Sequence, residues 1–148
     1  MQKLEIYQSL WGMQRRSPHA AERSDEQSFA MIAEVGFDGV CLDPTVDEIP
    51  TNLEKRALFE QHGLGCMINA FPHSVDDMAP LLEFARKMKA RMANVISGVM
   101  PIRPKDAVPT VCRWIAEADA VQMPLLFETH RDGLLNDLYF TLQLMDLV

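Results

Sequence analysis

The 148-residue sequence lacks the signatures of several large protein classes. No apolar run reaches the roughly 20 residues that a membrane-spanning helix needs, and no basic start followed by an apolar stretch marks a secretory signal. Neither GxGxxG nor a GxxxxGKS/T loop occurs, so the common nucleotide-phosphate motifs are absent. We therefore expect a cytoplasmic protein that makes no contact with a membrane.

Cysteines and basic residues are also scarce. The three cysteines, Cys41, Cys66 and Cys112, are far apart and form no CxxC pair, which argues against a disulfide framework or a zinc knuckle. We interpret all three as reduced, buried packing residues. The 14 basic residues against 21 acidic residues give a net charge of -7, which argues against nucleic-acid binding.

Five short apolar runs of strand length recur along the chain, and most are flanked by glycine or proline. We predict strands at residues 4–10, 39–42, 65–70, 92–96 and 124–129. Each run is followed by a segment with helical periodicity. This alternation predicts an α/β fold with a parallel sheet and right-handed crossovers.

Local signals place the helices between these strands. Capping boxes are predicted at Ser24–Gln27 and Thr51–Glu54, each marking a helix start. Pro80 and Pro109 are expected in the first turns of the third and fourth helices, where proline is tolerated. Asn136 is the expected cap of the fifth helix.

The spacing of roughly 30 residues per strand–helix unit is that of a βαβ step, and the sequence shows no linker, low-complexity stretch or second domain. Residues 1–148 are therefore predicted to form one domain. A doubly wound open sheet and a (β/α)₈ barrel both remain compatible with five units. A complete barrel needs about 250 residues, so the second alternative implies an incomplete, TIM-barrel-like fold.

The densest cluster of chemically active side chains is at residues 127–132, at the carboxyl end of the fifth predicted strand. Strand alternation places Glu128 and His130 on one face, about 7 Å apart, where they are suited to one metal ion or one substrate. We expect Glu128 to be a buried acid near the rim of a central cavity. The alternative is that Glu128 pairs with a Lys or Arg inside the sheet.

Four further residues follow predicted strands and are weighed as site residues. Gln8 and Trp11 lie at the end of the first strand, where Trp11 either stacks on a sugar or is simply an exposed aromatic residue. Asn69 either binds a hydroxyl group or forms a turn. Asp43 either ligates or caps, and the adjacent Pro44 favours the turn.

The segment FETHRD at 127–132, followed by GLLNDLYFTLQLMDLV at 133–148, resembles the sugar phosphate isomerase/epimerase group of the xylose-isomerase-like TIM barrel superfamily. Further matches are IYQSLWGM at 6–13, MIAEVGFDGVCLD at 31–43 and FPHSVDDMAPLLEFA at 71–85. The resemblance covers the whole chain.

The resemblance implies a TIM-barrel domain that binds a small-molecule sugar or sugar phosphate and a divalent metal, Mn²⁺, Mg²⁺ or Zn²⁺. The metal polarises the sugar while a carboxylate moves a proton. Glu128 matches the family's fifth-strand metal ligand and, with His130, is the expected catalytic pair. The expected substrate-binding residues are Gln8, Trp11, Asn69 and Arg131.

The chain departs from the family by stopping at Val148, before the strands that carry the family's Asp, His and second Glu ligands. We therefore expect a truncated chain that is inactive alone, or one completed by a second chain in a homo-oligomer. The open edge of the fifth strand favours such association. The alternative function is a non-catalytic half-barrel that serves in binding or oligomerisation. An abasic-site endonuclease, which shares the barrel, is disfavoured by the acidic balance.

Overall fold

The computed structural model describes residues 4–14, 19 and 21–148, and its centre is one sheet of five parallel strands in chain order. The strands are β1 (Tyr7–Ser9), β2 (Gly39–Leu42), β3 (Gly65–Ala70), β4 (Ala93–Val95) and β5 (Leu125–Phe127). All five predicted strands are confirmed, although the first, fourth and fifth are shorter than predicted. The strands alternate with helices and follow chain order without the reversal of a doubly wound sheet, so the chain has an incomplete TIM-barrel-like α/β fold.

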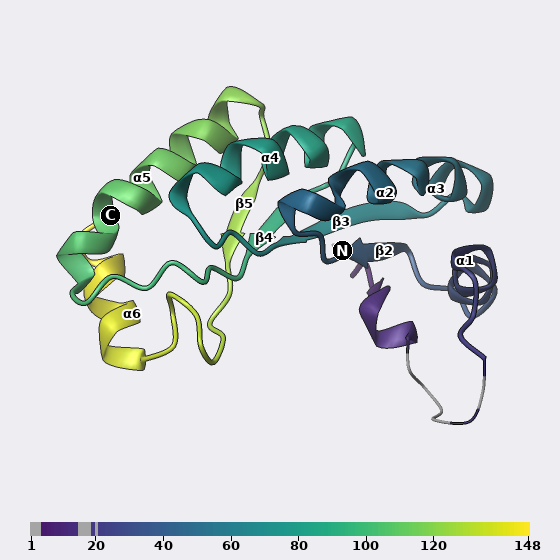
Figure 1. Cartoon of the computed structure of the whole chain (residues 1–148), viewed down its shortest axis with the longest axis horizontal. Coiled ribbons are helices and arrows are strands. Elements are labelled where there is room, and N and C mark those ends of the chain that lie inside the picture. Colours follow the sequence, from purple (N-terminus) through teal and green to yellow (C-terminus); the bar gives the residue numbers. More distant parts are fainter. Residues whose placement is uncertain (1–3, 15–18, 20) are drawn as a thin grey trace.

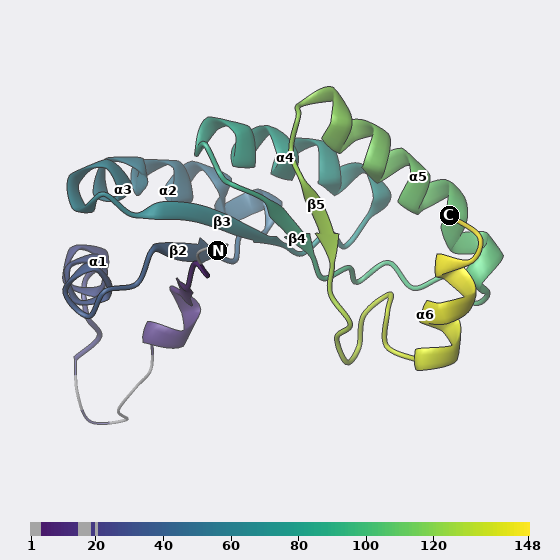
Figure 2. The same ribbon diagram turned by 180° about the vertical axis from the view of Figure 1, so that it is seen from behind.

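Helices and short 3₁₀ turns connect the strands. The 3₁₀ turns are η1 (Trp11–Met13), η2 (Val46–Glu48) and η3 (Val75–Asp77), and the helices are α1 (Asp25–Glu34), α2 (Ile49–Glu54), α3 (Arg56–His62), α4 (Met78–Lys87), α5 (Pro104–Ala120) and α6 (Leu138–Met145). Figure 1 shows α2 to α5 as a layer along one side of the sheet, and in Figure 2 β5 lies in front of this layer at α4 and α5. Within the described residues, no helix has the length and apolar character to cross a membrane.

The two faces of the sheet differ in burial because successive strand residues point to opposite sides. Val40, Ile68 and Val95 face the helix layer and are at most 1% exposed. Trp114 of α5 is fully buried and stacks on Phe127, with 6.4 Å between the ring centroids. The opposite side, which we call the open face, carries the polar residues described below.

One of the two predicted capping boxes is confirmed. The Gln27 amide donates to Ser24 Oγ at 3.2 Å, and the Ser24 amide donates to the Gln27 side chain at 3.1 Å. The prediction at Thr51–Glu54 is wrong, because these residues lie inside α2 and the box before this helix is formed by Thr45 and Glu48. Both segments fit the pattern T-x-x-E, so the pattern alone does not select between them.

Two other predicted helix starts are displaced. Pro109 lies inside α5 instead of in its first turn, because the helix begins at Pro104, and the helix forgoes one backbone hydrogen bond there. The cap of α6 is Asp137 and not Asn136. The Asp137 carboxylate accepts from the Phe140 amide at 2.8 Å.

The apolar residues that predicted α6 are largely exposed. Leu138, Leu142 and Met145 are 67%, 49% and 70% exposed, whereas the buried residues of this helix are Thr141 and Leu144. The predicted helix therefore forms, but within the described residues the side of α6 that carries Leu138, Leu142 and Met145 is not the side that packs on α5.

The cysteines divide into two environments. Cys41 and Cys66 are buried within the sheet, but Cys112 is exposed on α5, so the prediction of a packing role is wrong for Cys112. Burial, reinforced by the nearby Asp43 carboxylate, raises the pKa of Cys41 to about 12. Burial also raises the pKa of Cys66.

At the amino end of the open face, the Tyr7 ring lies across two glycines. Tyr7, Gly39 and Gly65 are register partners on β1, β2 and β3. A Cβ added to Gly39 would lie 2.3 Å from the Tyr7 ring, and one added to Gly65 would lie 2.8 Å from the Tyr7 hydroxyl oxygen. Both glycines are therefore required by the close approach of this ring.

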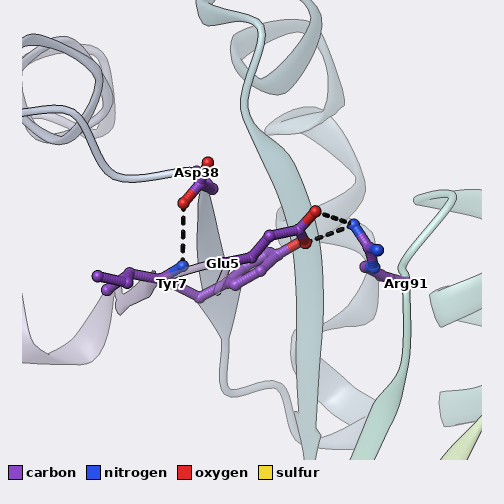
Figure 3. A network of polar contacts seen from close by, with 5 residues as sticks. Glu5, Tyr7, Asp38 and Arg91 are labelled. Atoms are coloured by element: carbon purple, nitrogen blue, oxygen red, sulfur yellow. Dashed lines mark hydrogen bonds and ion pairs between the residues drawn. The ribbon is translucent and has the colours of Figure 1, made fainter. Parts of the chain in front are cut away.

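Glu5 and Arg91 hold the hydroxyl end of Tyr7 (Figure 3). Arg91 pairs with both Glu5 carboxylate oxygens, and the Tyr7 hydroxyl donates to Glu5 Oε2 at 3.3 Å. The Ile6 amide donates to Asp38 Oδ2 at 3.0 Å. The start of β1 is thus tied to the segment before β2 and, across the sheet, to the segment before β4. Burial is the main cause of the raised pKa of Tyr7.

The Tyr7 contact predicts a selective rescue. Gly65→Ala should destabilise the protein by about 1–3 kcal/mol, because the new methyl group meets the Tyr7 hydroxyl. In a Tyr7→Leu background the same change should cost less than about 1 kcal/mol, because the next atom, the Asp38 carbonyl oxygen, lies 3.4 Å away. Urea unfolding of the four proteins measures this difference.

Gly39→Ala provides the matched control. Its Cβ would also lie 2.4 Å from the Gly65 carbonyl oxygen, which cannot move without the strand. Tyr7→Leu should therefore not rescue it. Equal rescue at Gly39 and Gly65 would contradict the geometry described.

Thiol labelling should distinguish the cysteines. In the native protein, a water-soluble disulfide reagent should modify Cys112 rapidly and leave Cys41 and Cys66 unmodified, because their thiols are buried and stay protonated. Mass spectrometry should find one rapid modification in the native state and three in denaturant. Rapid labelling of Cys41 in the native state would show that the sheet is not packed as described.

Candidate functional site

Five polar side chains, one associated with each strand, form a hydrogen-bonded row at the carboxyl edge of the sheet. Ser9 Oγ donates to Asp43 Oδ2 at 2.9 Å, and Asn69 Nδ2 donates to Asp43 Oδ1 at 2.6 Å. Asn94 Nδ2 donates to Asn69 Oδ1 at 3.1 Å and to Glu128 Oε2 at 2.5 Å. We call Ser9, Asp43, Asn69, Asn94 and Glu128 the polar row.

Parallel register brings these side chains together. Asn69 and Asn94 are direct partners on β3 and β4, and Asn94 is the partner of Leu126 on β5. Glu128 comes two residues after Leu126 and therefore lies on the same face. The Glu128 amide still donates to the Val95 carbonyl at 3.0 Å, which continues the pairing one step beyond β5.

The direction of each hydrogen bond in the row follows from its two carboxylates. An ionised carboxylate only accepts hydrogen bonds, so Asp43 requires Asn69 to turn its amide nitrogen toward it. The Asn69 oxygen then faces Asn94, and Asn94 must donate both to it and to Glu128. Bonds to a charged acceptor are the stronger kind, so Asp43 and Glu128 fix both amide orientations.

Exposure varies along the row and is highest at its last member, Glu128. Asn94 is only 7% exposed, and Ser9, Asp43 and Asn69 are half-buried. Glu128 is exposed, so the expectation of a buried acid is wrong. The reason is its position after β5, the edge strand of the described sheet, where no neighbouring strand covers it.

A pocket of about 400 Å³ adjoins the row at Asp43. It opens between the segment after β1 and helix α2, and Trp11 on its wall is 73% exposed. Its lining is mixed polar and apolar: Leu10, Trp11, Gln14, Leu42, Asp43, Glu48, Thr51, Asn52 and Lys55. The Lys55 ammonium group is held by Asp25 at 2.6 Å. Asp43 therefore faces both the pocket and the polar row.

The structure brings together only some of the predicted site residues. Asn69 and Glu128 are in the polar row, and Trp11 lines the adjoining pocket. Gln8 instead lines a different pocket of about 220 Å³, beside α1, and its side chain donates to the Ser9 carbonyl at 2.9 Å. Alternation explains this placement, because Gln8 and Ser9 are neighbours and point to opposite faces.

His130 and Arg131 are exposed in the segment after β5. The His130 ring Nδ1 lies 2.6 Å from the Arg131 carbonyl oxygen. No hydrogen bond or ion pair joins either side chain to the polar row within the described residues. Their catalytic and substrate-binding roles stay predictions.

Three members of the polar row are not predicted as site residues. The sequence pattern favours a turn at Asp43 and singles out neither Ser9 nor Asn94. The available signal at Asn94 is a single amide inside the apolar run at 92–96, where an uncharged polar side chain needs a partner. The signal at Ser9 is its place one residue before the end of the first run.

The predicted metal site is not complete in the described residues. They contain no group of three His, Cys, Asp or Glu side chains placed to hold an ion. The one row member bonded to the Glu128 carboxylate is the Asn94 amide, and Asp43 lies on the far side of Asn69.

The polar row predicts a specific cost for removing its first carboxylate. Asp43→Ala should leave the Ser9 hydroxyl and the Asn69 amide without their acceptor, and should lower the free energy of unfolding by about 1–3 kcal/mol. Asp119→Ala, at an exposed position of α5, is the control and should have little effect. Equal urea midpoints for Asp43→Ala and the control would show that the row does not form in solution.

No known family model matches this chain, and a search of curated proteins finds no relative. Solved structures do share its fold. L-ribulose 3-epimerase superposes with a TM-score of 0.69 at 14% identity over 97% of this chain and 57% of its own. The protein SMc04130 from Sinorhizobium meliloti 1021 gives 0.68 at 14% identity, covering 96% and 58%.

A synthase structure is also similar. The 4-hydroxy-tetrahydrodipicolinate synthase of Methylacidiphilum fumariolicum SolV has a TM-score of 0.59 at 16% identity, over 97% of this chain and 51% of its own. The chain thus spans a little over half the length of each of these structures. At such low identities the comparison establishes the fold: β1 to β5 and their helices form a TIM-barrel-like arrangement.

Proposed function

We propose that the carboxyl edge of this sheet binds a sugar, as part of an isomerase or epimerase-type site. The observation that carries the proposal is the polar row, in which all five strands contribute one side chain to a continuous line of hydrogen bonds. In α/β barrels this edge is where substrates bind. The likeness to L-ribulose 3-epimerase supports a sugar as the ligand.

The chemistry of the row suits hydroxyl groups. Its two carboxylates, Asp43 and Glu128, accept hydrogen bonds, and one Glu128 oxygen remains outside the bond to Asn94. The adjoining pocket of about 400 Å³ is within the size range of small-ligand sites. Trp11 on its wall supplies an apolar surface on which the C–H face of a sugar ring packs.

In this proposal Glu128 takes a proton from a sugar carbon or hydroxyl, with His130 and Arg131 reaching the ligand from the following segment. Such a base must approach its proton to hydrogen-bond distance. The exposure of Glu128 on the open face permits this approach. We further propose that Glu128 supplies one ligand to a divalent ion bound with the sugar, whose hydroxyl oxygens supply others.

A second candidate is binding without turnover, as a half-barrel module. The absence of a three-residue metal-ligand group among the described residues favours it. The two candidates share the sugar-binding edge and differ in whether bound sugar is converted.

Calorimetric titration with L-ribulose tests the shared part of the proposal. The wild-type protein should bind the sugar, and Asp43→Asn should bind about tenfold more weakly, because an amide replaces one acceptor with a donor. Asp119→Asn should bind like wild type. No heat of binding to the wild type, or equal affinity for Asp43→Asn, would overturn the sugar-binding edge.

Adding Mn²⁺ separates the finer claims. At concentrations 100-fold above its dissociation constant, a ligand stabilises the folded state by about 2.7 kcal/mol. Mn²⁺ should therefore raise the melting temperature further when L-ribulose is present, and Glu128→Gln should lose that increment. An identical melting temperature with and without Mn²⁺ would refute the metal claim. Bound but unconverted L-ribulose would favour the non-catalytic module, and conversion would favour the epimerase.

A further inference from the structure

Asn94 occupies the most buried position of the polar row and uses its amide nitrogen twice. It is 7% exposed, and both of its hydrogen bonds run along the row, to Asn69 Oδ1 at 3.1 Å and to Glu128 Oε2 at 2.5 Å. No other side chain in the row donates to two of its members. Asn94 is therefore the link through which the Asp43 end and the Glu128 end are connected.

We infer that Asn94 is the positioning residue of the site: by donating to both neighbours it holds Glu128 on the open face with one oxygen free, and it fixes the Asn69 amide so that its nitrogen serves Asp43. This inference rests on the proposed sugar-binding function and names the residue that orders its acceptors. Asn94 itself need not touch the sugar, because its donors are already committed to the protein.

Only an amide of this length satisfies both neighbours. A leucine of similar volume removes both donors and leaves the Asn69 oxygen and the Glu128 carboxylate without that partner. An aspartate keeps the shape but replaces the donors with a carboxylate facing Glu128. Two carboxylates at this distance disfavour simultaneous ionisation and share a proton.

The ionisable groups near Asn94 come from two strands, β2 and β5. Glu128 follows β5, Asp43 follows β2 and is reached through Asn69, and Cys41 lies on β2. The Cys41 thiol has a pKa of about 12, raised by burial first and then by Asp43 and Glu128. The Cys41 thiol remains protonated in the acid-to-neutral range. The pH dependence of the melting temperature of Asn94→Asp is therefore set by the carboxylates of Glu128 and Asp43.

A stability cycle tests the positioning role without any ligand. Asn94→Asp should melt progressively lower as the pH rises from about 5 to about 8, because its new carboxyl and Glu128 then lose the proton they share. Adding Glu128→Gln should remove most of this pH dependence. Asn94→Leu should be destabilised by the same amount throughout this range. Asn136→Asp, at an exposed position, is the control and should follow the wild type.

The same variants test the effect on the ligand. Asn94→Asp should bind L-ribulose about tenfold more weakly near pH 8 than near pH 5, whereas Asn94→Leu should be weak at both. If Asn94→Asp follows the wild-type melting profile, or if Glu128→Gln leaves its pH dependence unchanged, the positioning role is overturned. If the stability cycle behaves as expected but the wild type binds no L-ribulose, the proposed function fails while the Asn94–Glu128 coupling stands.

Discussion

The constraint on which the site depends is that a carboxylate can only accept hydrogen bonds. Asn69 and Asn94 lie between the carboxylates of Asp43 and Glu128. Only one orientation of their two side-chain amides directs an N–H group at each carboxylate and keeps the hydrogen bond between the asparagines. That arrangement requires Asn69 and Asn94 to be aligned on adjacent strands, which the parallel register provides. A slip of one residue in β4 would point Asn94 into the helix layer and separate the two carboxylates.

The open face has two layers, which we call the first tier and the second tier, and they differ in the interactions they contribute. Near the amino ends of the strands, the Tyr7 ring covers Gly39 and Gly65 and its hydroxyl reaches Glu5, tying β1 across the sheet. Near the carboxyl ends, the polar row replaces ring packing with hydrogen bonds. The first tier contributes chiefly packing, because its exposed Glu5–Arg91 ion pair is of a kind that adds little stability. The second tier places polar atoms where a ligand can reach them.

The fold was predictable from the sequence because its repeat is regular. The apolar runs at 39–42 and 65–70 match β2 and β3 residue for residue, and their spacing predicts parallel pairing. Helix starts were less predictable, since Thr45 and Thr51 begin the same pattern and only tertiary packing selects one. The exposed Leu138 shows the same limit, because periodicity predicts a helix but not which side of it packs.

The site was predictable only in part. Asn69 and Glu128 follow or end apolar runs and were recognised by position. Asn94 lies inside the apolar run at 92–96. Its place in the polar row depends on Asn69 and Glu128, which are distant in the sequence, so the residues around it do not predict this role. Gln8 is predicted to bind substrate, but its side chain points away from the polar row, because alternation along β1 places Gln8 and Ser9 on opposite faces. The burial of Glu128 could not be inferred, because it depends on what covers the edge strand.

The most direct test of the central claim is the side-chain amide region of a ¹H–¹⁵N NMR spectrum during addition of L-ribulose. If the polar row is a sugar-binding edge, the amide signals of Asn69 and Asn94 should shift together and saturate along one binding curve, while those of Asn136 stay in place. Shifts of Asn136 without shifts of Asn69 and Asn94, or no shifts at all, would contradict the account.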